Sequence, residues 1–363
     1  MSLTIGDIAA RLGAEAAGDL SLQVARLRQP DEAGAADLAL AIDPEFAEKL
    51  KGRAVRAAVV ADGADWQAMG LEAAIFSGRS RYTMAGLSRI FDRDPAPAPG
   101  IHPTAVIDPT ATLGEGASVG PHAVIGAHVT LGPRARIAGQ VTIGDRVTIG
   151  ADAYLMPGCR IGSDVTIGDR FIGQANAVIG GDGFSFVTPQ PNKVEDYMAK
   201  GSITESLDPT EYVRINSLGS VVIGDDVEVG ANSVIDKGTV SDTRIGNGTK
   251  VDAQVMVGHN VQVGEKTLLC AMTGIAGSTE IGNRVVLAGG VGVADHISIG
   301  DDSIILAGSG VTNRVPPKSV MMGYPALKQE VFMNIFKAMR RLPRLAEKVT
   351  DLQNRVSKPD HKG

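Results

Sequence analysis

Branched aliphatic residues recur at every sixth position through most of this 363-residue chain. The period holds over twelve consecutive positions in each of two series: Ile101, Ile107, Leu113, Val119, Ile125, Leu131, Ile137, Ile143, Ile149, Leu155, Ile161 and Ile167, then Ile245, Val251, Val257, Val263, Leu269, Ile275, Ile281, Leu287, Val293, Ile299, Ile305 and Val311. Neither a helix, with a period of 3.6, nor a lone strand, with a period of 2, accounts for this spacing. The period predicts a parallel β-helix, in which each hexapeptide forms one short strand and one turn with its aliphatic side chain pointing inward. Three such sides make a coil of about 18 residues, and coils stack about 4.8 Å apart.

The period lapses between the two series. The stretch "GGDGFSF" (180–186) leads into a polar segment that ends near Ser220, and the period resumes at Ile223 before it slips by four residues ahead of Ile245. We expect a loop projecting from the β-helix over about 184–220, and long ordered loops are more often functional than ordinary connections. A disordered insertion is the alternative for the middle of this segment.

The first 98 residues carry no hexapeptide period and predict a small α/β domain. "TIGDIAARL" predicts a short helix capped by Thr4. The apolar runs 57–61 and 72–76 predict strands, and "YTMAGLSRIF" (82–91) predicts a second helix. A Pro-rich stretch, 92–100, follows as a linker into the β-helix.

The β-helix domain is expected to span residues 99–325, and helices are expected over 326–363. The apolar residues after "MMGYPA" have helical spacing, with a break or kink expected at Pro343. Residues 328–363 hold nine Lys and Arg against four Asp and Glu, although the whole chain has a net charge of −6. This basic tail is either a helical segment that packs on its own oligomer or a docking surface for an acidic partner.

Composition narrows the class of protein. Aromatic residues make up 4% of the chain and there are 45 glycines, which suits a repetitive β architecture. The net negative charge argues against nucleic acid as the main partner. The two cysteines, Cys159 and Cys270, form no disulfide framework and fit a reducing, cytoplasmic location. The sequence has no signal-peptide pattern and no apolar run of about 18 residues, so no transmembrane segment is expected.

Coil arithmetic brings three candidate residues together. His259 lies in "VGHN"; a step of 18 leads to Gly277, and a second step leads to Asp295, next to His296. A neutral imidazole can take a proton from an attacking amine or hydroxyl, and a glycine N–H can hold the oxyanion of a tetrahedral intermediate. This strip therefore suits acyl transfer, although a lone histidine at a turn is usually a solvent-exposed turn residue. The histidines form no three-ligand cluster, so no metal is expected.

Several motifs resemble one family, the UDP-3-O-acylglucosamine N-acyltransferases of lipid A biosynthesis. They are "IGGDGF" (179–184), "SDTRIGNGTKVD" (241–252), the His–Asn pair of "VGHN" and the "GIAG" rung (274–277). The resemblance covers nearly the whole chain. It implies a mainly β fold, namely a left-handed parallel β-helix with a small N-terminal α/β domain and a C-terminal helical extension.

The resemblance also implies a reaction. These enzymes are homotrimers with active sites between neighbouring β-helices, and they move an (R)-3-hydroxyacyl chain from acyl carrier protein to the 2-amino group of UDP-3-O-acylglucosamine. His259 matches the family's general base, Gly277 its backbone oxyanion donor, and His296 a second active-site histidine. Asn260 joins the substrate-binding residues, and Asp252 is a weaker candidate that would orient or tune an imidazole.

The family recognises uridine with its N-terminal domain, and this chain departs from the usual residues there. The segment "LAIDPEF" places Leu40, Asp43 and Phe46 where the family has Phe, Asn and Tyr. Asp43 can accept a hydrogen bond from the uracil N3–H but cannot donate one as Asn can.

The acyl donor's carrier is strongly acidic, so the basic residues of the last third are expected to meet it. The candidates are Arg314, Lys337, Arg340, Arg341 and Arg344, with Lys318 as a further one. The carrier's phosphopantetheine brings the acyl group, and no other cofactor is expected.

Other functions remain as alternatives. The related O-acyltransferase acting on UDP-N-acetylglucosamine usually begins directly with the β-helix, whereas this chain has a domain before it. A bifunctional uridylyltransferase–acetyltransferase would begin with a Gly-rich nucleotide-binding segment, which "MSLTIGDIAARLG" is not. A non-catalytic β-helical scaffold is the alternative from another class, and the strip of His259, Gly277 and His296 speaks against it.

Overall fold

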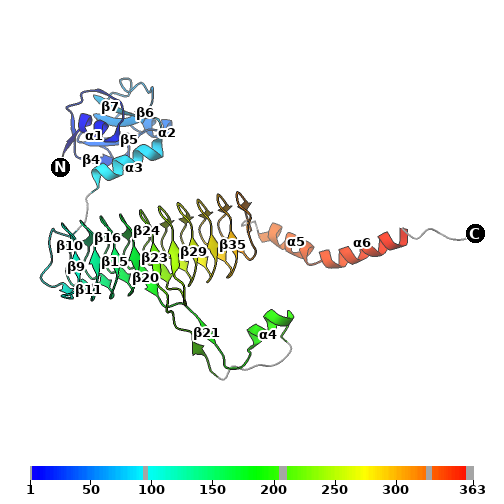
Figure 1. The fold of residues 1–363 in the computed structure, drawn as a ribbon. Helices are drawn as coiled ribbons and strands as arrows, with labels where there is room; N and C mark the ends of the chain where they lie inside the picture. Colours follow the sequence, from blue (N-terminus) through cyan, green and yellow to red (C-terminus); the bar gives the residue numbers. More distant parts are fainter. Residues whose placement is uncertain (1, 93–96, 204–210, 324–328, 357–363) are drawn as a thin grey trace, which may run out of the picture. The chain divides into compact units, whose positions relative to one another are not determined.

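The computed structural model describes residues 2–92, 97–203, 211–323 and 329–356. The chain divides into two compact units, Met1–Pro95 and Ala96–Gly363. The expected linker and the ends of the expected C-terminal region fall partly outside the described residues. Figure 1 shows the elements of each unit.

Over its described residues, the first unit is a five-stranded sheet with three helices beside it. The sheet has the order β2-β7-β6-β5-β4, parallel except for β2. Its elements are β2 (Ala16–Gly18), β4 (Arg26–Arg28), β5 (Asp37–Ala41), β6 (Ala57–Ala61) and β7 (Ala73–Ser77), with β1 (Leu3–Thr4) paired to β3 (Gln23–Val24), and helices α1 (Ile5–Leu12), α2 (Pro44–Glu48) and α3 (Ser80–Phe91). Thr4 caps α1, and its side chain accepts the Asp7 N–H.

Both faces of this sheet are buried, which explains the continuous apolar run of β6. Ala57 and Val59 belong to one apolar cluster with residues of α1 and α3, whereas Ala58 and Val60 belong to a second cluster on the other face. Successive side chains of a strand point to opposite faces of the sheet. When both faces are buried, every position of the strand is apolar and the usual alternation with polar residues is absent.

The second unit contains a parallel β-solenoid of three sheets, and the strand registers confirm the predicted β-helix. Sheet 1 comprises β8 (Val106–Ile107), β11 (Val124–Ile125), β14 (Thr142–Ile143), β17 (Arg160–Ile161), β20 (Val178–Gly181), β25 (Val234–Asp236), β28 (Met256–Val257), β31 (Gly274–Ile275), β34 (Gly292–Val293) and β37 (Gly310–Val311). Sheet 2 comprises β9 (Thr112–Leu113), β12 (Thr130–Leu131), β15 (Thr148–Ile149), β18 (Thr166–Ile167), β23 (Val221–Ile223), β26 (Thr243–Ile245), β29 (Gln262–Val263), β32 (Glu280–Ile281) and β35 (Ser298–Ile299). Sheet 3 comprises β10 (Ser118–Val119), β13 (Arg136–Ile137), β16 (Tyr154–Leu155), β19 (Ile172–Gly173), β24 (Glu228–Val229), β27 (Lys250–Val251), β30 (Leu268–Leu269), β33 (Val286–Leu287), β36 (Ile304–Ile305) and β38 (Val320–Met321).

The sixth-position aliphatics form one continuous core inside the three sheets. Nearly all of them are buried. At the corners, many residues other than glycine have a positive φ, including His122, His128 and His296. These corners turn the chain from one sheet to the next, and Asn and Asp, which tolerate this conformation, are frequent there.

Two insertions interrupt the 18-residue coil. A projecting loop leaves after β20 and returns at β23, so residues that bond across it are 56 apart in sequence. It contains a two-stranded ribbon, β21 (Phe186–Val187) with β22 (Val213–Arg214), and the helix α4 (Lys193–Lys200). A shorter insertion after β25 raises the separation of bonded neighbours to 22, which is the four-residue slip seen in the sequence.

The tail forms two helices, α5 (Gln329–Met339) and α6 (Leu342–Val356). The interruption falls at Arg340 and Arg341 rather than at the expected Pro343. Pro343 lies in the first turn of α6, where a missing N–H leaves no helical hydrogen bond unmade, so it starts a helix instead of breaking one.

Candidate active site

The predicted strip of His259, Gly277 and His296 lies along one corner of the solenoid, between sheets 1 and 2. Pairing of Val257 with Ile275, and of Ile275 with Val293, puts the three corner segments directly above one another. The Ser278 N–H donates to the His259 carbonyl at 2.9 Å, and the His296 N–H donates to the Gly277 carbonyl at 3.2 Å. We call His259, Gly277 and His296 the corner strip.

The imidazole of His259 lies against two glycines. A Cβ on Gly277 would stand 2.7 Å from Nε2, and a Cβ on Gly183 would stand 2.8 Å from the His259 Cβ. Real Cβ atoms essentially never come this close, so the ring fits only because both positions lack a side chain. Gly183 lies at the base of the projecting loop, where its N–H donates to Ser217 Oγ at 3.0 Å. The loop therefore supplies one wall of the site, which the six-residue period could not show.

His296 occupies a different position on the corner from His259. It has a φ of 55°, like Asn260 (61°), the residue that follows His259, and its side chain is exposed. Asp295, not His296, lies directly above Gly277 in the stack. The two imidazoles are thus separated by two coils and share no hydrogen bond among the described residues.

A buried carboxyl, Asp236, lies beside the site and was not among the predicted residues. It ends β25, whose Ile235 pairs with Val257, and it is 4% exposed. Burial raises the pKa of Asp236 to about 6, while His259 pulls it down and Asp182 pushes it up. The Lys237 ammonium pairs with Asp182 at 3.0 Å. An 18-residue step from His259 misses Asp236, because the four-residue insertion lies between them.

Asp252 lies on another corner, between sheets 3 and 1. Its carboxylate accepts the N–H of Ala253 at 2.7 Å and that of Ala271 at 3.0 Å. Within one chain, the structure does not bring Asp252 to the His259 imidazole.

An apolar groove runs along sheet 1 on one side of the corner strip. Its floor holds three glycines in successive strands, Gly274, Gly292 and Gly310, which have no side chain to fill the groove. Met256 lines one end of the groove. The groove has a volume of about 450 Å³ and is also lined by Ala276 and Ala294. Because Ala276 immediately precedes Gly277, the groove opens directly onto the strip.

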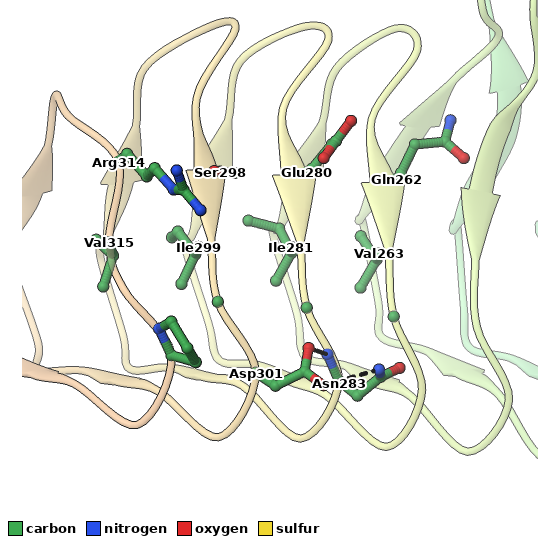
Figure 2. Close-up of a pocket in the computed structure, with 14 residues that line it drawn as sticks. Gln262, Val263, Glu280, Ile281, Asn283, Ser298, Ile299, Asp301, Arg314 and Val315 are labelled. Atoms are coloured by element: carbon green, nitrogen blue, oxygen red, sulfur yellow. Dashed lines mark hydrogen bonds between the residues drawn. The ribbon is translucent and has the colours of Figure 1, made fainter.

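A polar trough runs along sheet 2 on the other side of the strip (Figure 2). Its volume is about 530 Å³, and the side chains of Gln262, Glu280, Ser298 and Arg314 line it. Figure 2 shows the first three in successive strands, above the buried aliphatics Val263, Ile281 and Ile299. The corner strip thus separates an apolar channel from a polar one.

Comparisons with known proteins agree with this geometry. A model described as "Bacterial transferase hexapeptide (six repeats)" matches residues 122–155 and 140–170, and one described as "Hexapeptide repeat of succinyl-transferase" matches 220–259. A Ruegeria pomeroyi protein named UDP-3-O-acylglucosamine N-acyltransferase is 56% identical over 359 residues, 99% of both chains. The chain belongs to the UDP-3-O-acylglucosamine N-acyltransferase family. A Paracoccus denitrificans protein of the same name is 53% identical over 272 residues, 75% of this chain and 74% of that protein.

Membership of the N-acyltransferase family confirms the resemblance drawn from the sequence motifs and makes the chain an acyltransferase. The O-acyltransferase alternative is not favoured. A solved structure of Arabidopsis UDP-N-acetylglucosamine acyltransferase is similar with a TM-score of 0.52 and 23% identity, covering 62% of this chain and 71% of that one. That likeness shows the β-solenoid fold alone.

In this N-acyltransferase family member, the first unit gathers the three residues expected at uridine. Leu40, Asp43 and Phe46 line a cavity of about 170 Å³, together with residues that include Arg81. Asp43 precedes α2, yet its side chain makes no capping hydrogen bond. Its carboxylate is therefore available to a ligand in the cavity.

The basic residues expected at the carrier are exposed. Lys337 lies in the last turn of α5, Arg340 and Arg341 lie between the helices, and Arg344 lies in α6. Arg314 lies at the polar trough, and Lys318 lies at a solenoid corner with a φ of 58°. The structure thus divides the expected carrier-binding residues between the solenoid and the tail.

Over the described ranges, no three His, Cys, Asp or Glu side chains gather as a metal site would require. Within the same part of the chain, no helix combines the length and the apolar character of a bilayer span.

Proposed function

We propose that this chain transfers an (R)-3-hydroxyacyl group from acyl carrier protein to the 2-amino group of UDP-3-O-acylglucosamine. The observation that carries the proposal is the position of the His259 Nε2 against Gly277, at the mouth of an apolar groove. The names of the relatives supply the acceptor.

The corner strip supports each proton and electron movement of this reaction. The sugar amine attacks the thioester carbonyl while His259 takes the amine proton, which forms a tetrahedral intermediate. The Gly277 N–H donates to no group among the described residues, so it is free to hold the oxyanion. As the intermediate collapses, the C–S bond breaks, the departing phosphopantetheine thiolate takes the proton from the imidazolium to become the free thiol, and an amide remains. His296, two coils away, would contact the substrates farther along the strip.

The two channels beside the strip suit the two parts of the acyl donor. The hydrocarbon chain would lie in the groove over Gly274, Gly292 and Gly310, where no side chain intrudes. The polar phosphopantetheine arm would follow the trough on sheet 2. Arg314, which lines this trough, would bind the phosphate of the arm. The thioester would then lie at the strip between them.

The acceptor's uridine would enter the cavity of the first unit. Asp43 would accept the uracil N3–H, and the ring of Phe46 would lie against the base. Asp252 and Asn260 were expected to contact the substrate as well. Asp252 would do so from another copy of the chain, since within one chain its carboxylate lies on a different corner from His259.

We also propose a homotrimer, because sheet 3 carries an apolar ridge that a single chain leaves exposed. Leu268, Ile304 and Val320 are 43%, 39% and 67% exposed on successive or nearby coils. The ridge on sheet 3 and the glycine groove on sheet 1 repeat with the same coil spacing. The ridge of one copy can therefore pack over the groove of a parallel neighbouring copy, coil against coil. A closed ring of three would cover every groove.

The tail would bind acyl carrier protein. Lys337, Arg340, Arg341 and Arg344 give an exposed basic surface, and an acidic carrier would be steered to it over long range.

One experiment tests the reaction, the acceptor and the chain length together. Purified protein is incubated with UDP-3-O-acylglucosamine and a panel of hydroxyacyl carrier proteins, and the products are identified by mass spectrometry. We expect an alkali-stable amide on the amino sugar. An ester formed on UDP-N-acetylglucosamine, with no product from the amine, would establish the O-acyltransferase function instead.

A further inference from the structure

The four-residue insertion in the solenoid lies next to the proposed base. It falls in the segment 237–242, between β25 and β26, and makes bonded neighbours on adjacent coils 22 residues apart instead of 18. The backbone of this segment is bonded to the returning end of the projecting loop: the Leu218 N–H donates to the Thr239 carbonyl at 2.8 Å, and the Gly219 N–H donates to the Gly238 carbonyl at 3.0 Å. These bonds anchor the segment from the loop side.

The side-chain amide of Asn260 is bound to this segment at both ends. Its Oδ1 accepts the Thr239 N–H at 2.9 Å, and its Nδ2 donates to the Ser241 carbonyl at 2.8 Å. An N–H can only donate and a carbonyl can only accept, so these two partners settle which end of the amide is oxygen. The Asn260 backbone N–H donates in addition to Thr243 Oγ1 at 2.9 Å.

The same Oδ1 lies 3.1 Å from Nδ1 of His259. Because Oδ1 has no proton to give, the contact is a hydrogen bond only when Nδ1 carries the proton. In the neutral ring the lone pair is then on Nε2, the atom that faces Gly277.

We propose that Asn260 is a positioning residue that fixes the tautomer of His259, and that the segment 237–242 is the clamp that holds its amide. The inference rests on the proposed function for its effect on catalysis, but not for the tautomer itself. Both lone pairs of Oδ1 and one Nδ2 proton are already used within the chain. Asn260 therefore acts through His259 rather than as the substrate-binding residue that the sequence suggested.

The test replaces Asn260 by Ala and follows the ring nitrogens of His259. Protein with 15N-labelled histidine is studied by long-range 1H–15N correlation above the pH at which the ring is protonated. The wild-type ring is expected to carry its proton on Nδ1, and Asn260→Ala is expected to move population to the Nε2-protonated form. We expect kcat to fall about 10- to 100-fold with the KM for the sugar nucleotide unchanged.

Asn232→Ala is the matched control, because Asn232 is exposed on another corner with nearly the same backbone conformation, a φ of 58° against 61°. It introduces the same strain of an alanine at positive φ without touching the clamp. It should leave the ring signals and kcat unchanged.

A second variant, Asn260→Asp, keeps an acceptor for Nδ1–H but turns an oxygen toward the Ser241 carbonyl. It should keep the Nδ1-protonated ring and most of kcat while melting at a lower temperature. An Nε2-protonated ring in the wild type, or an unchanged tautomer in Asn260→Ala with a raised KM, would overturn the proposal. The ring signals need no substrate, so they report the tautomer even if no acyl transfer is found.

Discussion

His259 and Gly277 lie on neighbouring coils with no room between them for a methyl group, because a Cβ on Gly277 would stand 2.7 Å from the imidazole Nε2. The Gly277 N–H, which donates to no group among the described residues, thus belongs to a residue packed directly against the ring. A base and an oxyanion donor in that arrangement can act on one carbonyl group.

Replacing the base should stop the reaction and leave the assembly intact. In His259→Ala we expect the rate of N-acyl transfer to fall by about 10²- to 10⁴-fold, since proton removal from the amine is lost. Turnover from purified acyl carrier protein measures the rate, and sedimentation measures the oligomer. Near wild-type turnover would remove His259 from the role of base.

Adding one methyl group at Gly277 should displace the ring. Gly277→Ala is expected to lower kcat at least about tenfold, because the Cβ and the imidazole cannot both keep their places. Gly289→Ala is the matched control: Gly289 holds the same place in its hexapeptide on another corner, and its nearest contact would be an ordinary 3.5 Å. If both variants lose the same activity, crowding of His259 is not the cause.

Filling the apolar groove should shorten the acyl chain that the enzyme prefers. Within one chain, a Cβ at Gly292 meets nothing within 4 Å, so Gly292→Leu should leave the solenoid of each chain intact. Competition between carriers with chains of different length, read by mass spectrometry, should shift toward shorter products. An unchanged product distribution with an unchanged rate would place the hydrocarbon chain elsewhere.

The buried carboxyl of Asp236 predicts a pH dependence of stability. Burial raises its pKa from 3.8 to about 6, so between these values the folded chain binds more protons than the unfolded chain. Its contribution to stability is therefore greatest below about pH 4, falls as pH rises to about 6, and stays lowered above that. Above pH 6 the ionised, buried carboxylate lowers the free energy of unfolding. Asp236→Asn removes this loss of stability, which is about 1 to 3 kcal/mol at pH 8.

Chemical denaturation of wild type and Asp236→Asn at pH 4.5 and pH 8 checks this sign. The variant should gain stability relative to wild type as pH rises. Asp302→Asn provides the opposite control, because its hydrogen bond with Arg284 lowers the pKa of Asp302 and removing it should cost stability at high pH. A gain for Asp236→Asn at pH 4.5 and none at pH 8 would contradict the assignment.

Reversing the charge of Arg340, Arg341 and Arg344 should weaken the encounter with an acidic carrier. We expect the KM for acyl carrier protein to rise and its salt dependence to flatten, with kcat little changed. A chain with Arg11, Arg53 and Arg89 reversed, all exposed in the first unit, controls for the change of net charge. Equal effects of the two sets would leave the tail as a packing element.

The sequence predicted which corner segments stack on one another where the solenoid is regular. The step from His259 to Gly277 and on to Asp295 works because every strand pair in that part is 18 residues apart. The same arithmetic could not find Asp236, since an insertion of unknown shape separates it from His259. Gly183 was out of reach for the same reason.

Predictions of secondary structure from short stretches of sequence were limited in the same way. Pro343 suggested a helix break, but a proline is equally at home in a first turn, and only the backbone shows that the chain had already turned at Arg340 and Arg341. In the first unit, "AAVVA" predicted a strand without showing that apolar clusters bury both of its faces.

Because the coils are uniform, the length of the solenoid can change by whole coils of 18 residues. Removing one 18-residue coil from the regular part before β20 would rejoin strands in the same register and keep every aliphatic facing inward. Such a deletion would shift the corner strip along the axis by about 4.8 Å and alter nothing within it. Family members of different lengths can thus vary the reach of the solenoid while they inherit the same catalytic corner.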